Sequence, residues 1–175
     1  MATGRAAWCH LLWRLGMLYY LPAAALRRWR APRRPLAPAR ILCVRLDGLG
    51  DFFTFAPALM LLRQALPNAC LTLWIEREAL RPFVAHHHLA DEIIVGPAPE
   101  RSSWRQQWSR FAPGEFDLVL LSRKQRGPAW QCAAFRWSRG RLAGFSHHPR
   151  LSLYSDNLAG DSTSEMLAHV TGCLR

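Results

Sequence analysis

Short apolar runs alternate along most of the chain with longer segments of mixed polarity, and Gly, Pro and Asn mark the turns between them. The runs with the length and content of buried strands are 40–46, 70–75, 91–95, 116–121 and 141–145. The segments with helical length or spacing are 52–66, 77–84, 103–111 and 129–137, and a capping box at 162–165 opens a last helix. This alternation predicts an α/β fold, a parallel sheet with helices on both faces, whose ligand crevice lies at the carboxyl ends of the strands.

Charge is distributed unevenly over the 175 residues. The net charge is +11, and the first 40 residues hold eight arginines and no acidic residue, whereas the remainder holds 15 basic and 12 acidic residues. Because the chain is 50% hydrophobic, a disordered protein is excluded. We therefore divide the chain into a basic arm at 1–39 and a globular domain at 40–175. The five cysteines are widely spaced and form no CxxC pair, so we expect buried, reduced thiols and a cytoplasmic protein.

The arm contains an apolar stretch, 11–26, which is interrupted by Arg14 and includes Pro22. It is shorter than the roughly 20 residues that span a bilayer. We interpret it as a helix in the membrane interface, so that residues 8–34 form a peripheral contact with the inner membrane. The side chains expected to face the acyl chains are Trp8, Leu11, Leu12, Leu15, Tyr19 and Tyr20.

Other interpretations of the arm stay open at this point. They are a cleaved signal peptide, a disordered leader, sequence translated from a mis-assigned start, and a nucleic-acid arm. No nucleic-acid-binding motif accompanies the arginines, so we expect no nucleic-acid partner.

The loop Asp47-Gly-Leu-Gly-Asp51 joins the first predicted strand to the first predicted helix of the domain. A dinucleotide site would need a third small residue where Phe53 stands, and the charge of Asp51 would oppose a pyrophosphate. A carboxylate at a helix N-terminus beside two glycines suits a general base that takes the proton of a substrate hydroxyl. The alternative is that Asp51 only caps the helix.

The residues around this loop resemble a known family. Arg40-Ile-Leu-Cys-Val-Arg-Leu-Asp-Gly-Leu-Gly-Asp51, with Thr54 and Pro57-Ala-Leu59, is similar to the opening of glycosyltransferase family 9, the ADP-heptose:lipopolysaccharide heptosyltransferases. The later segments that agree in order are 66–69, 91–94, 116–119, 141–145 and a closing helix with His169. The resemblance covers about residues 40–175.

The resemblance implies the N-terminal, Rossmann-like half of a GT-B glycosyltransferase, the half that binds the acceptor. It implies an inverting transfer from an ADP-heptose-type donor to a lipopolysaccharide core or lipid A–Kdo acceptor, with no tightly bound cofactor. Asp51 matches the family's proposed base. Arg45 matches a basic position that orients that carboxylate or meets an acidic sugar, and Asp47, Gly48 and Gly50 belong to the loop that the acceptor approaches.

Several other residues are candidates from the sequence itself. Arg123, Lys124 and Arg126 follow the strand at 116–121, so we expect them at the same edge as Asp51, either binding acceptor carboxylates or phosphates or forming a solvated turn. The sequence His86-His-His88 is expected to be a solvated loop rather than a metal site, because three consecutive residues do not readily face one ion. Four tryptophans are expected either to pack or to be exposed at a lost interface: Trp104, Trp108, Trp130 and Trp137.

The sequence departs from the family pattern in its length. It stops near Arg175, about where a nucleotide-sugar domain would begin, so we expect that half to be absent and this chain to be inactive or very weakly active by itself. The alternative is a non-catalytic Rossmann-like remnant or a membrane-associated binding module.

Overall fold

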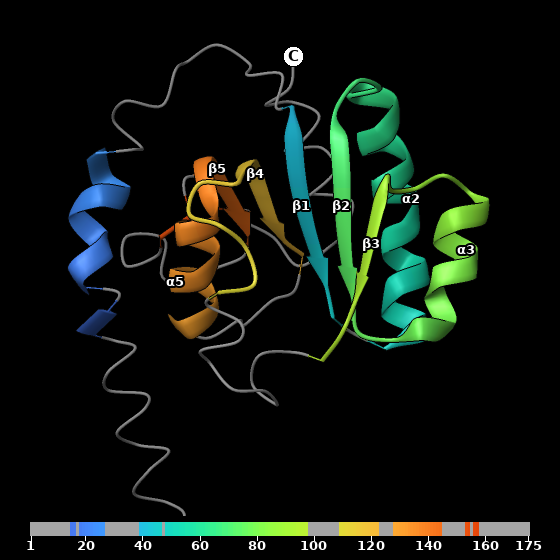
Figure 1. Cartoon of the computed structure of the whole chain (residues 1–175), viewed down its shortest axis with the longest axis horizontal. Helices are drawn as coiled ribbons and strands as arrows, with labels where there is room; N and C mark the ends of the chain where they lie inside the picture. The colour runs from blue at the N-terminus through green and yellow to red at the C-terminus, as the bar shows by residue number, and fades with distance from the viewer. Residues whose placement is uncertain are drawn as a thin grey trace, which may run out of the picture.

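The six strands among the residues that the structure describes form one parallel sheet in the order β3-β2-β1-β4-β5-β6 (Figure 1). Their bounds are β1 Arg40–Arg45, β2 Cys70–Ile75, β3 Glu92–Val95, β4 Phe116–Leu121, β5 Ser138–Gly144 and β6 Asp156–Asn157. The computed structural model describes residues 15–16, 18–26, 39–46, 48–97, 109–122, 128–144, 153–154 and 156–157. All the predicted strands are confirmed, whereas the two-residue β6 is too short to leave a pattern in the sequence.

Helices cover both faces of the sheet, as the alternation predicted (Figure 1). On one face lie α2 Leu49–Ala65, the short 3-10 helix η1 Glu78–Leu80 and α3 Arg81–His86. On the other face lie α5 Pro128–Trp137 and an N-terminal helical segment described at 15–16 and 18–26. The predicted helix at 103–111 lies mostly outside the described residues, and the predicted last helix lies wholly outside them.

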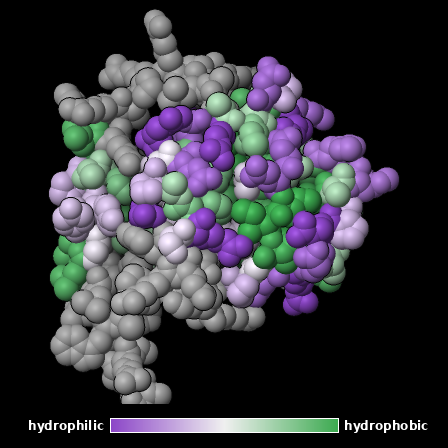
Figure 2. All heavy atoms as spheres, in the orientation of Figure 1, coloured by the Kyte–Doolittle hydropathy of each residue, from purple (hydrophilic) through white to green (hydrophobic). Residues whose placement is uncertain are grey.

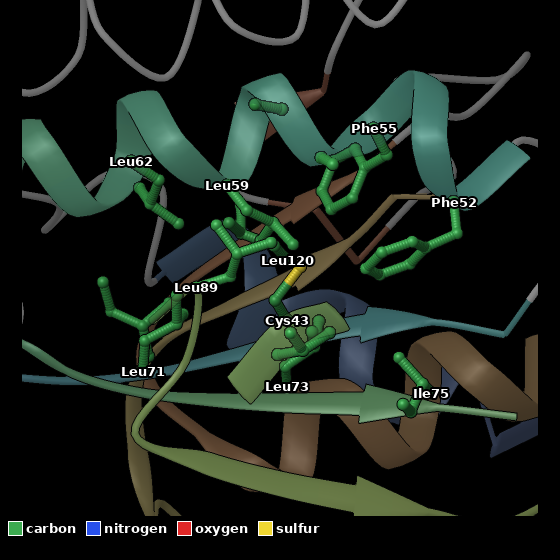
Figure 3. Close-up of a cluster of buried hydrophobic side chains, with 14 of the residues drawn as sticks. Cys43, Phe52, Phe55, Leu59, Leu62, Leu71, Leu73, Ile75, Leu89 and Leu120 are labelled. Carbon is green, nitrogen blue, oxygen red and sulfur yellow. The ribbon is translucent and has the colours of Figure 1, made fainter. Parts of the chain in front are cut away.

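The first core lies between the sheet and α2. Alternate side chains of the strands, such as Cys43 and Leu73, point toward Phe52, Phe55 and Leu59 of α2 (Figure 3). All five are at most 2% exposed. Both faces of a parallel sheet are covered, so its strands read as continuous apolar runs, and this is why the strands could be found from the sequence.

The second core lies between the sheet and α5 and is rich in tryptophan. Trp74 of β2 has its ring centroid 5.6 Å from that of Trp130 and 6.1 Å from that of Trp137. Trp130 and Trp137 are 1% and 0% exposed, so the expectation that they lie at an exposed interface is wrong, and the packing interpretation holds for them. Trp104 and Trp108 lie outside the described residues.

The N-terminal helical segment packs on the second core. Tyr20 lies with its ring centroid 5.4 Å from that of Phe135, and Ala24 is 1% exposed. The prediction that Tyr20 faces acyl chains is therefore wrong, because α5 covers it, whereas Tyr19 is exposed. In the described part of the chain, no helix is both long and apolar enough to cross a membrane.

Carboxylates hold the strands together at the amino edge of the sheet. Asp117 of β4 accepts hydrogen bonds of 3.0 Å from the amides of Arg40, the first residue of β1, and of Ala39 just before it. It also pairs with Arg139 of β5. Burial raises the pKa of Asp117, but the bonds from Arg139 and from the two amides outweigh burial and leave this pKa below its ordinary value.

A second carboxylate acts in the same way one strand further along. Asp91 accepts a hydrogen bond of 2.7 Å from the amide of Leu71. It also forms an ion pair of 2.7 Å with Arg63 at the end of α2. Its pKa is also lowered, because these bonds outweigh the effect of burial. Charged side chains therefore bond the amino ends of neighbouring strands to one another.

The replacement Asp117→Asn is expected to reduce the free energy of unfolding by about 1–2 kcal/mol at neutral pH, because charge-assisted bonds to two amides are weakened. A lowered folded-state pKa stabilises the native state above the unfolded-state pKa of about 3.9, and this contribution disappears as the pH falls through the folded-state value. Urea titrations of both proteins over a pH series should therefore converge on acidification. Glu78→Gln, which breaks only an exposed pair with Arg81, is the control and should change stability by less than about 0.5 kcal/mol. A stability gap between Asp117→Asn and wild type that does not depend on pH would contradict this role.

Thiols in both cores should resist alkylation. Cys43 and Cys132 are buried and unbridged, and burial raises the pKa of Cys132 to about 12. Because only the thiolate reacts, iodoacetamide at mildly alkaline pH should modify Cys132 at least about 100-fold more slowly in the folded protein than in denaturant. Peptide mass spectrometry of quenched samples measures this ratio. Equal rates in the two states would show that the thiol of Cys132 is not buried in the second core.

Candidate functional site

The strand order marks the carboxyl ends of β1 and β4 as the place where a ligand crevice is expected. The chain moves from β1 toward β3 on one side and from β4 toward β6 on the other, so the direction of winding reverses between β1 and β4. In parallel α/β sheets, ligands bind where such a reversal separates two strand ends. Gly48, which follows β1, and Ser122, which follows β4, lie at this point.

Asp51 lies in the first turn of α2, above this crevice. The helix begins with Gly48 as an extended N-cap (φ −61°, ψ 164°) that makes no side-chain capping bond. Asp51 lies three residues further on, so it is not the N-cap, although an acid in the first turn still interacts favourably with the helix dipole.

The spacing of residues along α2 shows on which side of the helix Asp51 lies. Asp51, Phe55, Ala58 and Leu62 are spaced by four, three and four residues, so they share one helix face. The last three are buried against the sheet, whereas Asp51 is exposed. Asp51 therefore continues the face that packs on the sheet to a point beyond the carboxyl edge of the sheet.

The two glycines leave room beside this carboxylate. A Cβ added to Gly50 would meet no atom within 4 Å, and one added to Gly48 would lie 3.8 Å from Oδ2 of Asp51, which is an ordinary contact. The fold thus has space for a side chain at both positions. Their glycines leave the main chain open to a ligand.

Arg45, the last residue of β1, is buried beneath the site. Its Nη1 donates a hydrogen bond of 2.8 Å to the carbonyl oxygen of Ser122, and its Nη2 donates one of 2.8 Å to the carbonyl oxygen of Asp51. The guanidinium also lies 5.0 Å from the ring centroid of Phe55. Both hydrogen bonds go to main-chain carbonyls, so Arg45 joins the ends of β1 and β4 to the first turn of α2. Whether it also meets an acceptor stays a prediction.

Ser122 and Thr54 complete this set of hydrogen bonds. The hydroxyl of Ser122 donates to the carbonyl of Val44 at 2.9 Å, and the hydroxyl of Thr54 donates to the carbonyl of Asp51 at 2.8 Å. Sequence analysis did not select Ser122. The available signal was a polar residue directly after a strongly apolar strand.

Arg110 is a second cation at the carboxyl edge that sequence analysis missed. Its guanidinium lies 4.4 Å from the ring centroid of Trp74, near the end of β2. It also lies 3.4 Å from the position of a Cβ on Gly96, just after β3. Burial lowers the pKa of Arg110. Stacking on the indole face gives this cation a defined place at the edge.

The other predicted site residues divide into two groups. Asp47, Arg123, Lys124 and Arg126 lie outside the described residues, so their acceptor-binding role stays a prediction. His86, His87 and His88 are exposed at the end of α3, and no group of three potential metal ligands occurs in the part of the chain that the structure describes.

Comparisons with known proteins agree with this geometry at the level of the fold. No protein-family model matches the sequence, and no curated protein matches it. A solved structure of glycosyl transferase family 9 from Veillonella parvula DSM 2008 is similar, with a TM-score of 0.50 and 24% identity over 62% of this chain. The structure of the E. coli heptosyltransferase WaaC with ADP-2-deoxy-2-fluoro heptose is also similar, with a TM-score of 0.51 and 17% identity over 75% of this chain.

The matched region is only part of each of those proteins. It covers 32% of the Veillonella chain and 46% of the WaaC chain. At these identities the similarity concerns the fold. This chain therefore has the Rossmann-like α/β fold that the two glycosyltransferase structures contain.

Proposed function

We propose that this domain is the acceptor-binding half of a GT-B glycosyltransferase that transfers a heptose to a lipopolysaccharide-type acceptor. The observation that carries the proposal is the position of Asp51, an exposed carboxylate on the sheet-facing side of α2 at the crevice of a fold shared with two glycosyltransferases. The heptosyltransferase structure contains an ADP-heptose analogue, which supports a nucleotide-sugar donor.

Asp51 is the proposed general base. Its carboxylate accepts the proton of an acceptor hydroxyl while the hydroxyl oxygen bonds to the anomeric carbon of the donor sugar. The bond from that carbon to the diphosphate breaks, the diphosphate leaves with the electron pair, and the configuration at the carbon is inverted. The open main chain at Gly50 lets the acceptor come close to the carboxylate.

Cations around the crevice are the proposed binding groups for an acidic acceptor. Arg123, Lys124 and Arg126 follow Ser122 in the sequence, and Arg110 lies at the same edge of the sheet. Acidic sugars and phosphates pair well with such groups. Asp47, Gly48 and Gly50 form the loop that faces the acceptor hydroxyls in this proposal.

The donor half of the reaction requires a nucleotide-sugar domain that the described residues do not include. We propose that no cofactor is held tightly here, and that the domain acts at the cytoplasmic face of the inner membrane, where its acceptor is anchored. Residues 1–175 tested by themselves should bind acceptor yet transfer little or no sugar.

Isothermal titration of the full chain tests the binding assignment. A Kdo-containing lipid A analogue should bind in the absence of nucleotide, and ADP should give no heat of binding. ADP binding without glycolipid binding would identify the crevice as a nucleotide site and overturn the proposal. Binding of neither ligand would favour a non-catalytic remnant.

In the complete enzyme, in which a nucleotide-sugar domain accompanies this one, Asp51→Asn should lower kcat by about 10²–10⁴-fold, the range expected for loss of a general base. Acceptor affinity and Tm should stay close to wild type, because the carboxylate is exposed and Asp51 is not the N-cap of α2. The measurements are initial rates of heptose transfer, acceptor titration and thermal unfolding. An Asp51→Asn enzyme with full activity would return Asp51 to a purely structural role.

The replacement Arg45→Lys separates a positioning role from acceptor binding. A lysine retains the charge but lacks the fork that reaches two carbonyl oxygens, so the variant should lose about 1–3 kcal/mol of stability and lower kcat while KM for acceptor changes little.

Arg63→Lys is the matched control for this variant. The guanidinium of Arg63 also meets a main-chain carbonyl, that of Ala69, but it does so at the amino edge of the sheet. The Arg63→Lys variant should lower the free energy of unfolding without changing the rate of heptose transfer. If Arg45→Lys instead raised KM at unchanged stability, direct recognition of the acceptor would be the better explanation.

A further inference from the structure

The N-terminal helical segment is apolar on two opposite faces, and α5 accounts for only one of them. The inward face carries Tyr20, Leu21 and Ala24, which pack on the second core. A Cβ on Gly16 would lie 3.9 Å from Sγ of Cys132, which shows how closely the segment approaches α5. Figure 1 shows the segment in blue on the outer side of α5.

The outward face is exposed. Leu15, Leu18, Tyr19 and Leu26 are 52%, 59%, 80% and 44% exposed. Their spacing of three, one and seven residues places all four on one side of a helix, opposite Ala24. Hydrophobic residues of the segment lie on the left edge of the molecule in Figure 2. Large apolar side chains gathered on an exposed face mark a surface that binds a partner.

Charge indicates the kind of partner. Arg14 precedes the segment, and Arg27, Arg28 and Arg30 follow it directly in the sequence. The first 40 residues contain eight arginines and no acidic residue. Two copies of this segment would repel one another, whereas a surface of anionic lipids matches both the apolar face and the positive flanks.

We propose that the outward face of the N-terminal helical segment docks in the interface of an anionic bilayer, parallel to the membrane plane. Leu15, Leu18 and Leu26 enter the acyl boundary, Tyr19 lies at the level of the headgroups, and the flanking arginines bind lipid phosphates. The inward face remains on α5, so binding requires no unfolding of the domain. The proposal deepens the membrane location proposed above by naming the surface and the lipid class.

Vesicle co-sedimentation of the full chain tests this surface. Sucrose-loaded vesicles of phosphatidylcholine containing phosphatidylglycerol should bind the protein, and vesicles of phosphatidylcholine alone should bind it at least about tenfold more weakly. Added salt should weaken binding, because the headgroup contacts are screened. The vesicles contain no glycosyl acceptor, so failure here leaves the transferase proposal standing. Full transfer activity in Asp51→Asn would contradict the transferase proposal and leave the membrane proposal standing.

A triple variant carrying Leu15→Ser, Leu18→Ser and Tyr19→Ser removes the apolar face and retains every arginine. It should bind anionic vesicles at least about tenfold more weakly, with unchanged circular dichroism. The matched control is Met60→Ser with Leu61→Ser, which removes exposed apolar side chains from α2 and should bind as wild type does.

Three results would overturn the proposal. The first is equal binding of the triple variant and wild type to anionic vesicles. The second is equal binding of wild type to neutral and anionic vesicles. The third is a wild-type chain that ignores vesicles but forms a dimer that the triple variant abolishes, because a second copy of the chain would then be the partner.

Discussion

The guanidinium of Arg45 is the contact on which the geometry of the crevice depends. It bonds to the carbonyl oxygens of Ser122 and Asp51 and so ties the end of β4, the end of β1 and the first turn of α2 into one unit. The N-cap of α2 is a glycine without a capping side chain, so the start of this helix is held from below by Arg45. A buried charge is tolerated at this point because two main-chain carbonyls accept hydrogen bonds from it.

The two edges of the sheet are built in opposite ways. At the amino edge, the carboxylates of Asp117 and Asp91 accept hydrogen bonds from main-chain amides and pair with arginines, and these bonds join the ends of neighbouring strands. At the carboxyl edge, the carboxylate of Asp51 is exposed and Gly50 has open space beside it. Carboxylates therefore stabilise the amino edge through bonds that they accept within the protein. At the carboxyl edge the stabilising charge is the cation Arg45, and the proposed base is left exposed.

Patterns along the chain predicted the elements better than the contacts between them. Strands buried on both faces are continuous apolar runs, so β1 to β5 could be located, and the loop before Asp51 could be placed at their carboxyl ends. The partners of Arg45 could not be foreseen, because one of its bonds goes to a main-chain oxygen 77 residues away. The burial of Tyr20 was missed for the same reason, since only tertiary packing reveals that α5 covers one side of an apolar helix.

The N-terminal helical segment and α2 lie on different faces of the sheet, and this constrains how a lipid-anchored acceptor would reach Asp51. The N-terminal helical segment lies on the α5 side of the sheet, whereas α2, which carries Asp51, lies on the other side. Docking of the N-terminal helical segment on a bilayer thus places neither α2 nor Asp51 against the lipid. The acceptor sugars would have to rise from the membrane to the carboxyl edge of the sheet, which is the edge where the strand ends are open.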